Sequence, residues 1–150
     1  MIAITWPSAQ EVEVVDAIRG AIGREVNFIT HTVSGCSACS LDPVTNTSTD
    51  SWCLTCSGRY WIETYSGTLI SGHITWGQAD ILNWYSAGQQ FDGDCRVQIK
   101  YTITNLELVK TCDWVEVDDK KLQVKKTILR GVQPLNRILI DLVELEEDLT

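Results

Sequence analysis

Hydrophobic residues near the N-terminus recur at the spacing of an amphipathic helix, at steps of three and four. The apolar stripe consists of Val12, Val15, Ile18 and Ile22. The preceding Ser8-Ala-Gln-Glu11 is a capping box, and Gly23 is a natural stop. The pattern therefore predicts a helix from about residue 8 to residue 22. Its stripe would pack either on a sheet of the same chain or on a neighbouring subunit.

Most of the remaining chain has the alternation, or the β-branched and aromatic composition, of strands. Strands are expected at residues 25–33, 59–65, 69–76, 95–101, 114–117, 122–129 and 137–145, with a turn at Asp118-Asp119. The last segment also has helical spacing, but the alternation of Ile138, Ile140 and Leu142 favours a strand. Residues 80–93 are less regular. The expected fold is mainly β: one domain over residues 1–150, a small β-barrel or sandwich with one N-terminal helix.

Four cysteines interrupt this pattern in two matched pairs, Cys36-Ser-Ala-Cys39 and Cys53-Leu-Thr-Cys56. Two Cys-x2-Cys pairs at this separation are typical of a structural zinc site. The polar segment between them has almost nothing to bury, so a metal would give it order. The sequence therefore predicts a Zn²⁺-bound hairpin insertion at about residues 34–58. Because all four ligands are cysteine, no position is open for a substrate.

Two other interpretations of the cysteines remain open. Disulfides are possible for an even number of cysteines, but no secretory signal is visible at the N-terminus, and reducing compartments favour metal binding. A redox dithiol is suggested by Trp52-Cys53-Leu-Thr-Cys56, although such motifs open a helix in thioredoxin-like proteins, and here a strand-like segment follows. Cys95 falls on the inward face of its strand and is expected to be a small buried residue. Cys112 is expected to be partly exposed.

Composition narrows the possible functions. The 150-residue chain is 44% hydrophobic and 21% charged, as in an ordered globular protein, with no apolar run long enough for a membrane span. Its net charge is −8, and residues 34–58 contain no Lys or Arg. Binding to nucleic-acid phosphates requires clustered basic residues, so the cysteine segment is not expected to bind DNA or RNA. Six tryptophans suit either core packing or interface anchors.

Motifs that carry catalysis are missing from the sequence: it has no Walker loop, no G-x-G-x-x-G, no His-Glu-x-x-His and no nucleophile elbow. The two histidines, His31 and His73, could ligate a metal, but four cysteines already complete a tetrahedron. Both are therefore expected at polar strand positions. We expect no enzymatic activity, no small-molecule substrate and no bound cofactor beyond the structural Zn²⁺.

The C-terminal third resembles a known group of viral proteins. It reads Asp113-Trp-Val-Glu-Val117, Asp118-Asp-Lys120, Leu122-Gln-Val124 and then Arg137-Ile-Leu-Ile-Asp-Leu-Val143. This arrangement is similar to the strand–hairpin–strand region of tailed-bacteriophage head–tail joining proteins, the connector or "stopper" group. Asp119 stands where the family often has Gly, and Leu122 where it often has an aromatic residue. The cysteine-paired insertion is not a general family feature.

The resemblance implies a virion protein of the head–tail junction, made in the host cytoplasm. Such a protein forms a homo-oligomeric neck ring between the portal or adaptor side and the tail, and helps to close the DNA channel. DNA would pass without specific binding, for which an acidic surface is suited because it repels phosphates. No membrane is involved. The alternative from a different class is a zinc-stabilised adaptor module that binds proteins in a cellular complex.

Overall fold

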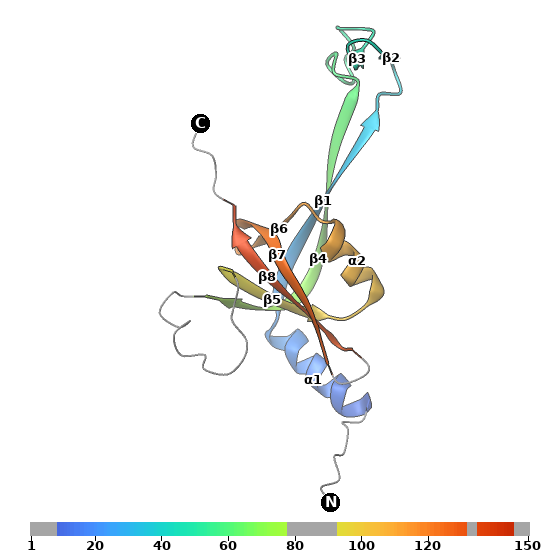
Figure 1. Cartoon of the computed structure of the whole chain (residues 1–150). Coiled ribbons are helices and arrows are strands. Elements are labelled where there is room, and N and C mark those ends of the chain that lie inside the picture. The colour runs from blue at the N-terminus through green and yellow to red at the C-terminus, as the bar shows by residue number, and fades with distance from the viewer. Residues whose placement is uncertain (1–8, 78–92, 132–134, 146–150) are drawn as a thin grey trace, which may run out of the picture. The chain divides into compact units, whose positions relative to one another are not determined.

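The computed structural model describes residues 9–77, 93–131 and 135–145 (Figure 1). Its elements are α1 (Ala9–Ile22), β1 (Arg24–Gly35), β2 (Leu41–Asp42), β3 (Thr47–Ser48), β4 (Trp61–Trp76), β5 (Cys95–Lys100), α2 (Ile103–Thr111), β6 (Trp114–Val117), β7 (Lys120–Arg130) and β8 (Arg137–Glu144). The predicted mainly β fold with one N-terminal helix is confirmed.

The chain divides into two compact units. The barrel unit comprises residues 1–29 and 67–150, and the cysteine unit comprises residues 30–66. Strands β1 and β4 each contribute residues to both units. The insertion predicted at about residues 34–58 lies inside the cysteine unit.

Six antiparallel strands close the barrel in the order β1-β4-β5-β8-β7-β6, and β6 pairs back with β1 (Figure 1). The inward positions of β5 and β8 alternate as the sequence predicted and meet in register, Val97 opposite Ile140 and Ile99 opposite Ile138. Together with Phe28 they belong to one buried cluster. Cys95 is part of this cluster, as its place in the alternation predicted, and Cys112 is half-buried. The barrel thus owes its order to its own apolar core.

Two predicted strands, at 59–65 and 69–76, form the single strand β4. The Gly67 between them is not a turn residue. A Cβ at Gly67 would lie 2.6 Å from the side-chain oxygen of Asn27 on β1, so glycine allows the two strands to approach closely. The hairpin of β6 and β7 is confirmed, and Asp118 and Asp119 make its turn with positive φ angles of 50° and 64°.

Helix α2 was not predicted. It is short and buries only Val109 fully, so its apolar periodicity is weak. The Thr102 side chain caps it by accepting a hydrogen bond from the Asn105 backbone N–H at 3.0 Å. Ser8 of the predicted capping box and residues 80–92 of the less regular segment lie outside the described residues.

Helix α1 has the predicted extent, but its apolar stripe is largely uncovered. Asp16 and Gly20 line a cavity whose other residues come from β4, β5 and β8, so this side of the helix faces the barrel. Val14, Val15, Ile18 and Ile22 are all exposed, and helical spacing places them on the opposite side. Within the described residues the helix therefore presents an apolar face to solvent. No described helix is long and apolar enough to cross a membrane.

Candidate metal centre

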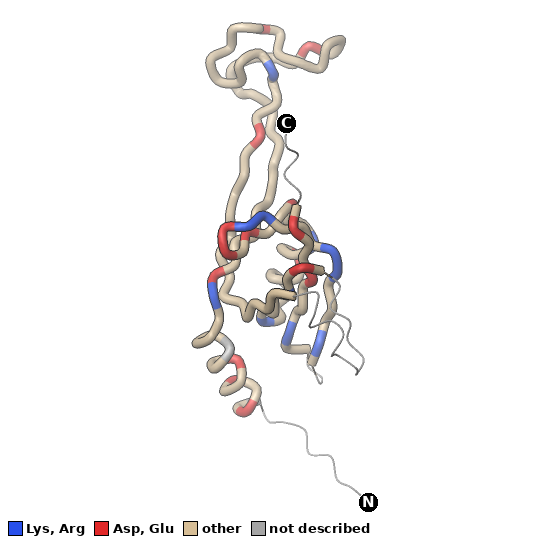
Figure 2. Tube along the Cα trace, turned by 90° about the vertical axis from the view of Figure 1, so that its left-hand side faces the viewer, with Lys and Arg blue, Asp and Glu red and all other residues tan. Residues whose placement is uncertain are grey.

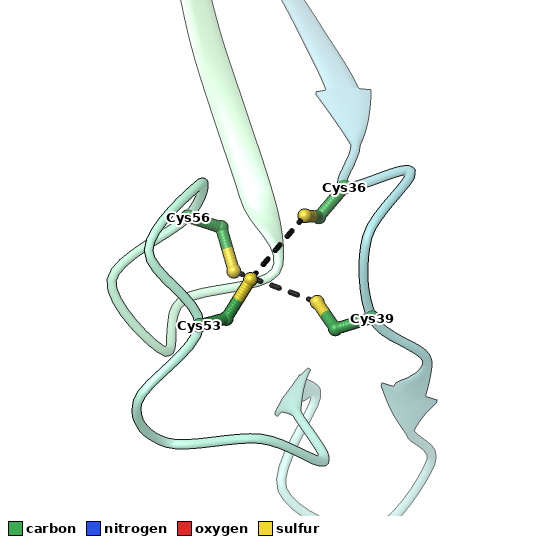
Figure 3. A group of neighbouring side chains, drawn as sticks. All are labelled: Cys36, Cys39, Cys53 and Cys56. Carbon is green, nitrogen blue, oxygen red and sulfur yellow. Dashed lines mark hydrogen bonds between the residues drawn. The ribbon is translucent and has the colours of Figure 1, made fainter.

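All four paired cysteines meet at one point of the cysteine unit (Figure 3). Cys36 follows β1 directly, Cys39 precedes β2, and Cys53 and Cys56 lie in turns between β3 and β4. Their sulfur atoms lie within 4.8 Å of one another. The close pairs join the two motifs, Cys36 Sγ to Cys53 Sγ at 3.8 Å and Cys39 Sγ to Cys56 Sγ at 3.5 Å. Every residue of the predicted site is thus brought together.

The spacing suits a tetrahedral ion. A Zn–S bond of about 2.3 Å places the sulfurs of a tetrahedral site about 3.8 Å apart. The Cys36–Cys53 and Cys39–Cys56 separations lie close to that value, and all the sulfurs are within 4.8 Å of one another. All six cysteines of the chain are free thiols, so no disulfide joins the pairs. Three of the four cluster residues, Cys36, Cys53 and Cys56, are buried, and Cys39 is half-buried.

Backbone contacts shape the two cysteine turns. The Cys36 backbone N–H donates to the Tyr60 carbonyl at 2.8 Å. This bond joins the first cysteine pair to the residue that immediately precedes β4. The Ser57 N–H donates to the Cys53 carbonyl at 2.8 Å. Gly58 has a φ of +80°, and a Cβ there would lie 2.8 Å from the Ser51 carbonyl oxygen, so only glycine fits this turn.

Ser48 and Tyr60 support the centre and were missed from sequence. Ser48 is buried, donates through its hydroxyl to the Asp50 carbonyl at 2.8 Å and accepts from the Asp50 N–H at 3.0 Å. The Tyr60 ring packs against the cysteine cluster and also covers Gly35. No local pattern marks either residue, because both act through contacts that form only when the two pairs meet.

Two thiols of the cluster, those of Cys39 and Cys56, have pKa values shifted in opposite directions. The Ser48 hydroxyl favours the Cys39 thiolate, but burial and the three neighbouring thiols outweigh it and raise the pKa of Cys39 to about 12. Burial opposes charge on Cys56, but the Tyr60 backbone N–H and the other thiols lower its pKa to about 6. A thiol cluster that shares its protons in this way can become four thiolates when a cation binds.

The histidines stand apart from the cluster. Among the described residues, the cysteines alone make up this group of metal-ligating side chains. The His31 ring stacks on Tyr65 with 4.8 Å between centroids, and His31 Nε2 lies 3.8 Å from a Glu63 carboxylate oxygen. His73 lies on β4 and lines the cavity beside α1. Both occupy strand positions, as predicted.

The surface of the cysteine unit is apolar and acidic. Trp52 and Leu54 flank Cys53 and are 90% and 101% exposed, and Val44 at the β2–β3 turn is 90% exposed. Residues 30–66 contain one basic residue, Arg59, and three acidic residues, Asp42, Asp50 and Glu63 (Figure 2). Comparison with protein families, curated proteins and solved structures finds no match to this chain.

Proposed function

We propose that Cys36, Cys39, Cys53 and Cys56 hold one structural Zn²⁺. The observation that carries this is the convergence of four cysteine sulfurs within 4.8 Å of one another, with two of the separations at 3.8 and 3.5 Å. The redox alternative is less favoured, because Cys53 and Cys56 lie in turns and not at the start of a helix.

Elemental analysis tests this assignment. Protein purified in reducing buffer without chelator is expected to contain about one equivalent of zinc per chain, as a single four-cysteine site requires. Cys53→Ser should lose that metal, whereas Cys112→Ser, which changes a cysteine outside the cluster, should retain it. Wild-type protein without metal and with blocked thiols would instead favour disulfides. Turnover in an insulin-reduction assay would favour a redox dithiol.

We further infer that the protein is a structural, non-catalytic connector in the neck of a tailed-bacteriophage virion. It would form a ring between the portal or adaptor side and the tail. Two features support this in addition to the C-terminal resemblance. The apolar face of α1 and the Trp52–Leu54 pair offer surfaces suited to protein contacts. The net charge of −8 suits a channel that passes DNA without binding it.

An adaptor module in a cellular complex remains the second candidate, because the same exposed apolar residues would serve it. Electron microscopy of the native particle separates the two. Density for the chain in a closed ring on the head–tail axis would support the connector, since a head-to-tail contact that closes forms a ring. Absence of the chain from purified virions, or a reproducible enzymatic activity lost with Cys53→Ser, would overturn it.

A further inference from the structure

On the outer face of the barrel, strand register places residues of β7, β8 and β5 directly beside one another. Each such set of paired residues is called a row. Directly paired residues of neighbouring antiparallel strands point to the same face. On β5 and β8 the inward positions are apolar, so Arg96, Gln98 and Lys100 point outward, as do Leu139 and Asp141. A register shift on β7 between Val124 and Lys126 brings Lys126, Ile128 and Arg130 to this outer face.

Three of these rows differ sharply in charge. In the first, Lys126 and Arg96 both pair with Asp141, so a carboxylate separates two cations. In the second, Ile128 and Gln98 pair with Leu139 and add no charge. In the third, Arg130 and Lys100 both pair with Arg137, so three cationic residues occupy neighbouring positions across β7, β8 and β5.

Like charges at directly opposed positions destabilise a sheet. The first row avoids this with its central carboxylate, but the third row contains no acidic residue. This accumulation occurs in a chain whose net charge is −8, so it does not follow from a generally basic surface. The row therefore concentrates positive charge at one place on the described part of this face, where an anion is favoured.

A cavity lies directly beside this row. Its volume is about 200 Å³, and two of its walls come from Lys100 and Arg137. His73 and Ser71 on β4 and Asp16 on α1 also line it. Among the described residues that line the cavity, Asp16 is the one carboxylate, and Lys100 and Arg137 are the two cations. Among the described lining residues, positive charge therefore exceeds negative charge even with Asp16 ionised.

The size and donors of the cavity define the ligand. Pockets for drug-sized molecules have volumes of roughly 300–1,000 Å³, so this cavity suits a single small group and not a whole nucleotide. A guanidinium can hold a phosphate oxygen pair with two parallel hydrogen bonds, and an ammonium adds a point charge. The Ser71 hydroxyl and the His73 ring can supply further polar contacts.

We propose that this cavity binds a phosphate group, held by Arg137 and Lys100, with Arg130 adding its charge from the neighbouring strand. The phosphate could be free or could be the end of a larger phosphate monoester. This inference does not depend on the zinc centre or on the connector assignment. Its failure would leave both of those intact.

Calorimetric titration of the whole protein with inorganic phosphate tests the proposal, at constant pH and ionic strength. Saturable one-to-one binding is expected. Sodium chloride and acetate at equal ionic strength should give less heat. Chloride has no oxygens, and acetate offers the guanidinium two oxygens but carries a single charge and has no further oxygen for the ammonium. Equal responses to phosphate, acetate and chloride would mean general screening and would overturn the proposal. Glycerol phosphate in place of inorganic phosphate distinguishes a site that accepts a monoester from one that accepts only the free ion.

Matched variants locate the site. Arg137→Gln and Lys100→Gln should each weaken phosphate binding, the former by about ten-fold or more, as expected for a lost charge-assisted contact. Lys126→Gln removes a cation from the same face but from the row with Asp141, and should leave binding unchanged. Lys100 is exposed, so its variant keeps the test valid even if Arg137→Gln does not fold. Unchanged binding in Lys100→Gln, or an equal loss in Lys126→Gln, would contradict the assignment.

Discussion

Cys95 shows how burial alters one side chain. Burial raises the pKa of its thiol from 9.0 to about 12. Between these values the unfolded chain loses the thiol proton while the folded barrel keeps it, so folding stability falls as pH rises through this window. We expect the free energy of unfolding of wild type, minus that of Cys95→Ala, to decrease from pH 9 towards pH 12. Denaturant titrations of both proteins at matched ionic strength measure this difference in unfolding free energy. A constant difference would show that the folded barrel does not suppress ionisation of this thiol.

Arg96 and Asp141 form a buried pair on the outer side of the sheet. Arg96 Nε and Nη2 donate to the two Asp141 carboxylate oxygens at 2.5 and 2.8 Å, and this hydrogen bonding raises the pKa of Arg96. Asp141→Asn would leave a buried guanidinium without its counter-charge, which costs about 3–5 kcal/mol. We expect a loss of that size in urea unfolding. Lys126→Gln, beside the same carboxylate but exposed, is the control and should change stability by less than about 0.5 kcal/mol.

At the scale of elements, the cysteine unit and the barrel have different sources of order. The described part of residues 30–66 buries little besides Ser48 and three cysteines, whereas the barrel has a large apolar cluster. Cys53→Ser should therefore expose residues 30–66 to protease and leave a folded barrel. Limited proteolysis with mass spectrometry detects the cuts, and Cys112→Ser should resist them. Unfolding of the whole chain would show that the two units share one cooperative transition.

Elements and ligands could be predicted from sequence where the signal is local. The cysteine spacing, the alternation at residues 95–101 and the hairpin at Asp118-Asp119 all depend on neighbours in the chain. The long-range features could not be predicted. Ser48 and Tyr60 support the cysteines from separate segments, and the row of Lys100, Arg130 and Arg137 depends on strand register and on the shift after Val124. Arg96 lies on the outer face of β5, where alternation favours a solvated side chain, but it is buried against Asp141.

At the scale of the whole molecule, the residues that fold the chain differ from those offered to partners. Trp52 and Leu54 are almost fully exposed, so removing them costs little stability, within about 0.5 kcal/mol. The Trp52 backbone N–H donates to the Asp50 carboxylate at 3.0 Å. This hydrogen bond fixes the backbone that carries the Trp52 side chain. Exposed tryptophans held in this way are suited to act as interface anchors.

This prediction rests on the proposed zinc site and the proposed role as a virion connector. The double substitution Trp52→Ser with Leu54→Ser should keep the zinc content and the melting temperature of wild type but reduce incorporation into assembled particles. Complementation of a deletion phage, with quantification of the chain in purified virions, measures that incorporation. Ile103→Ser is the control, since Ile103 is also an exposed apolar residue but lies on α2 in the barrel unit. Full incorporation of the double variant would show that these side chains are not anchors. Loss of zinc would show that they support the metal centre, and the assembly defect could then not be assigned to a lost contact.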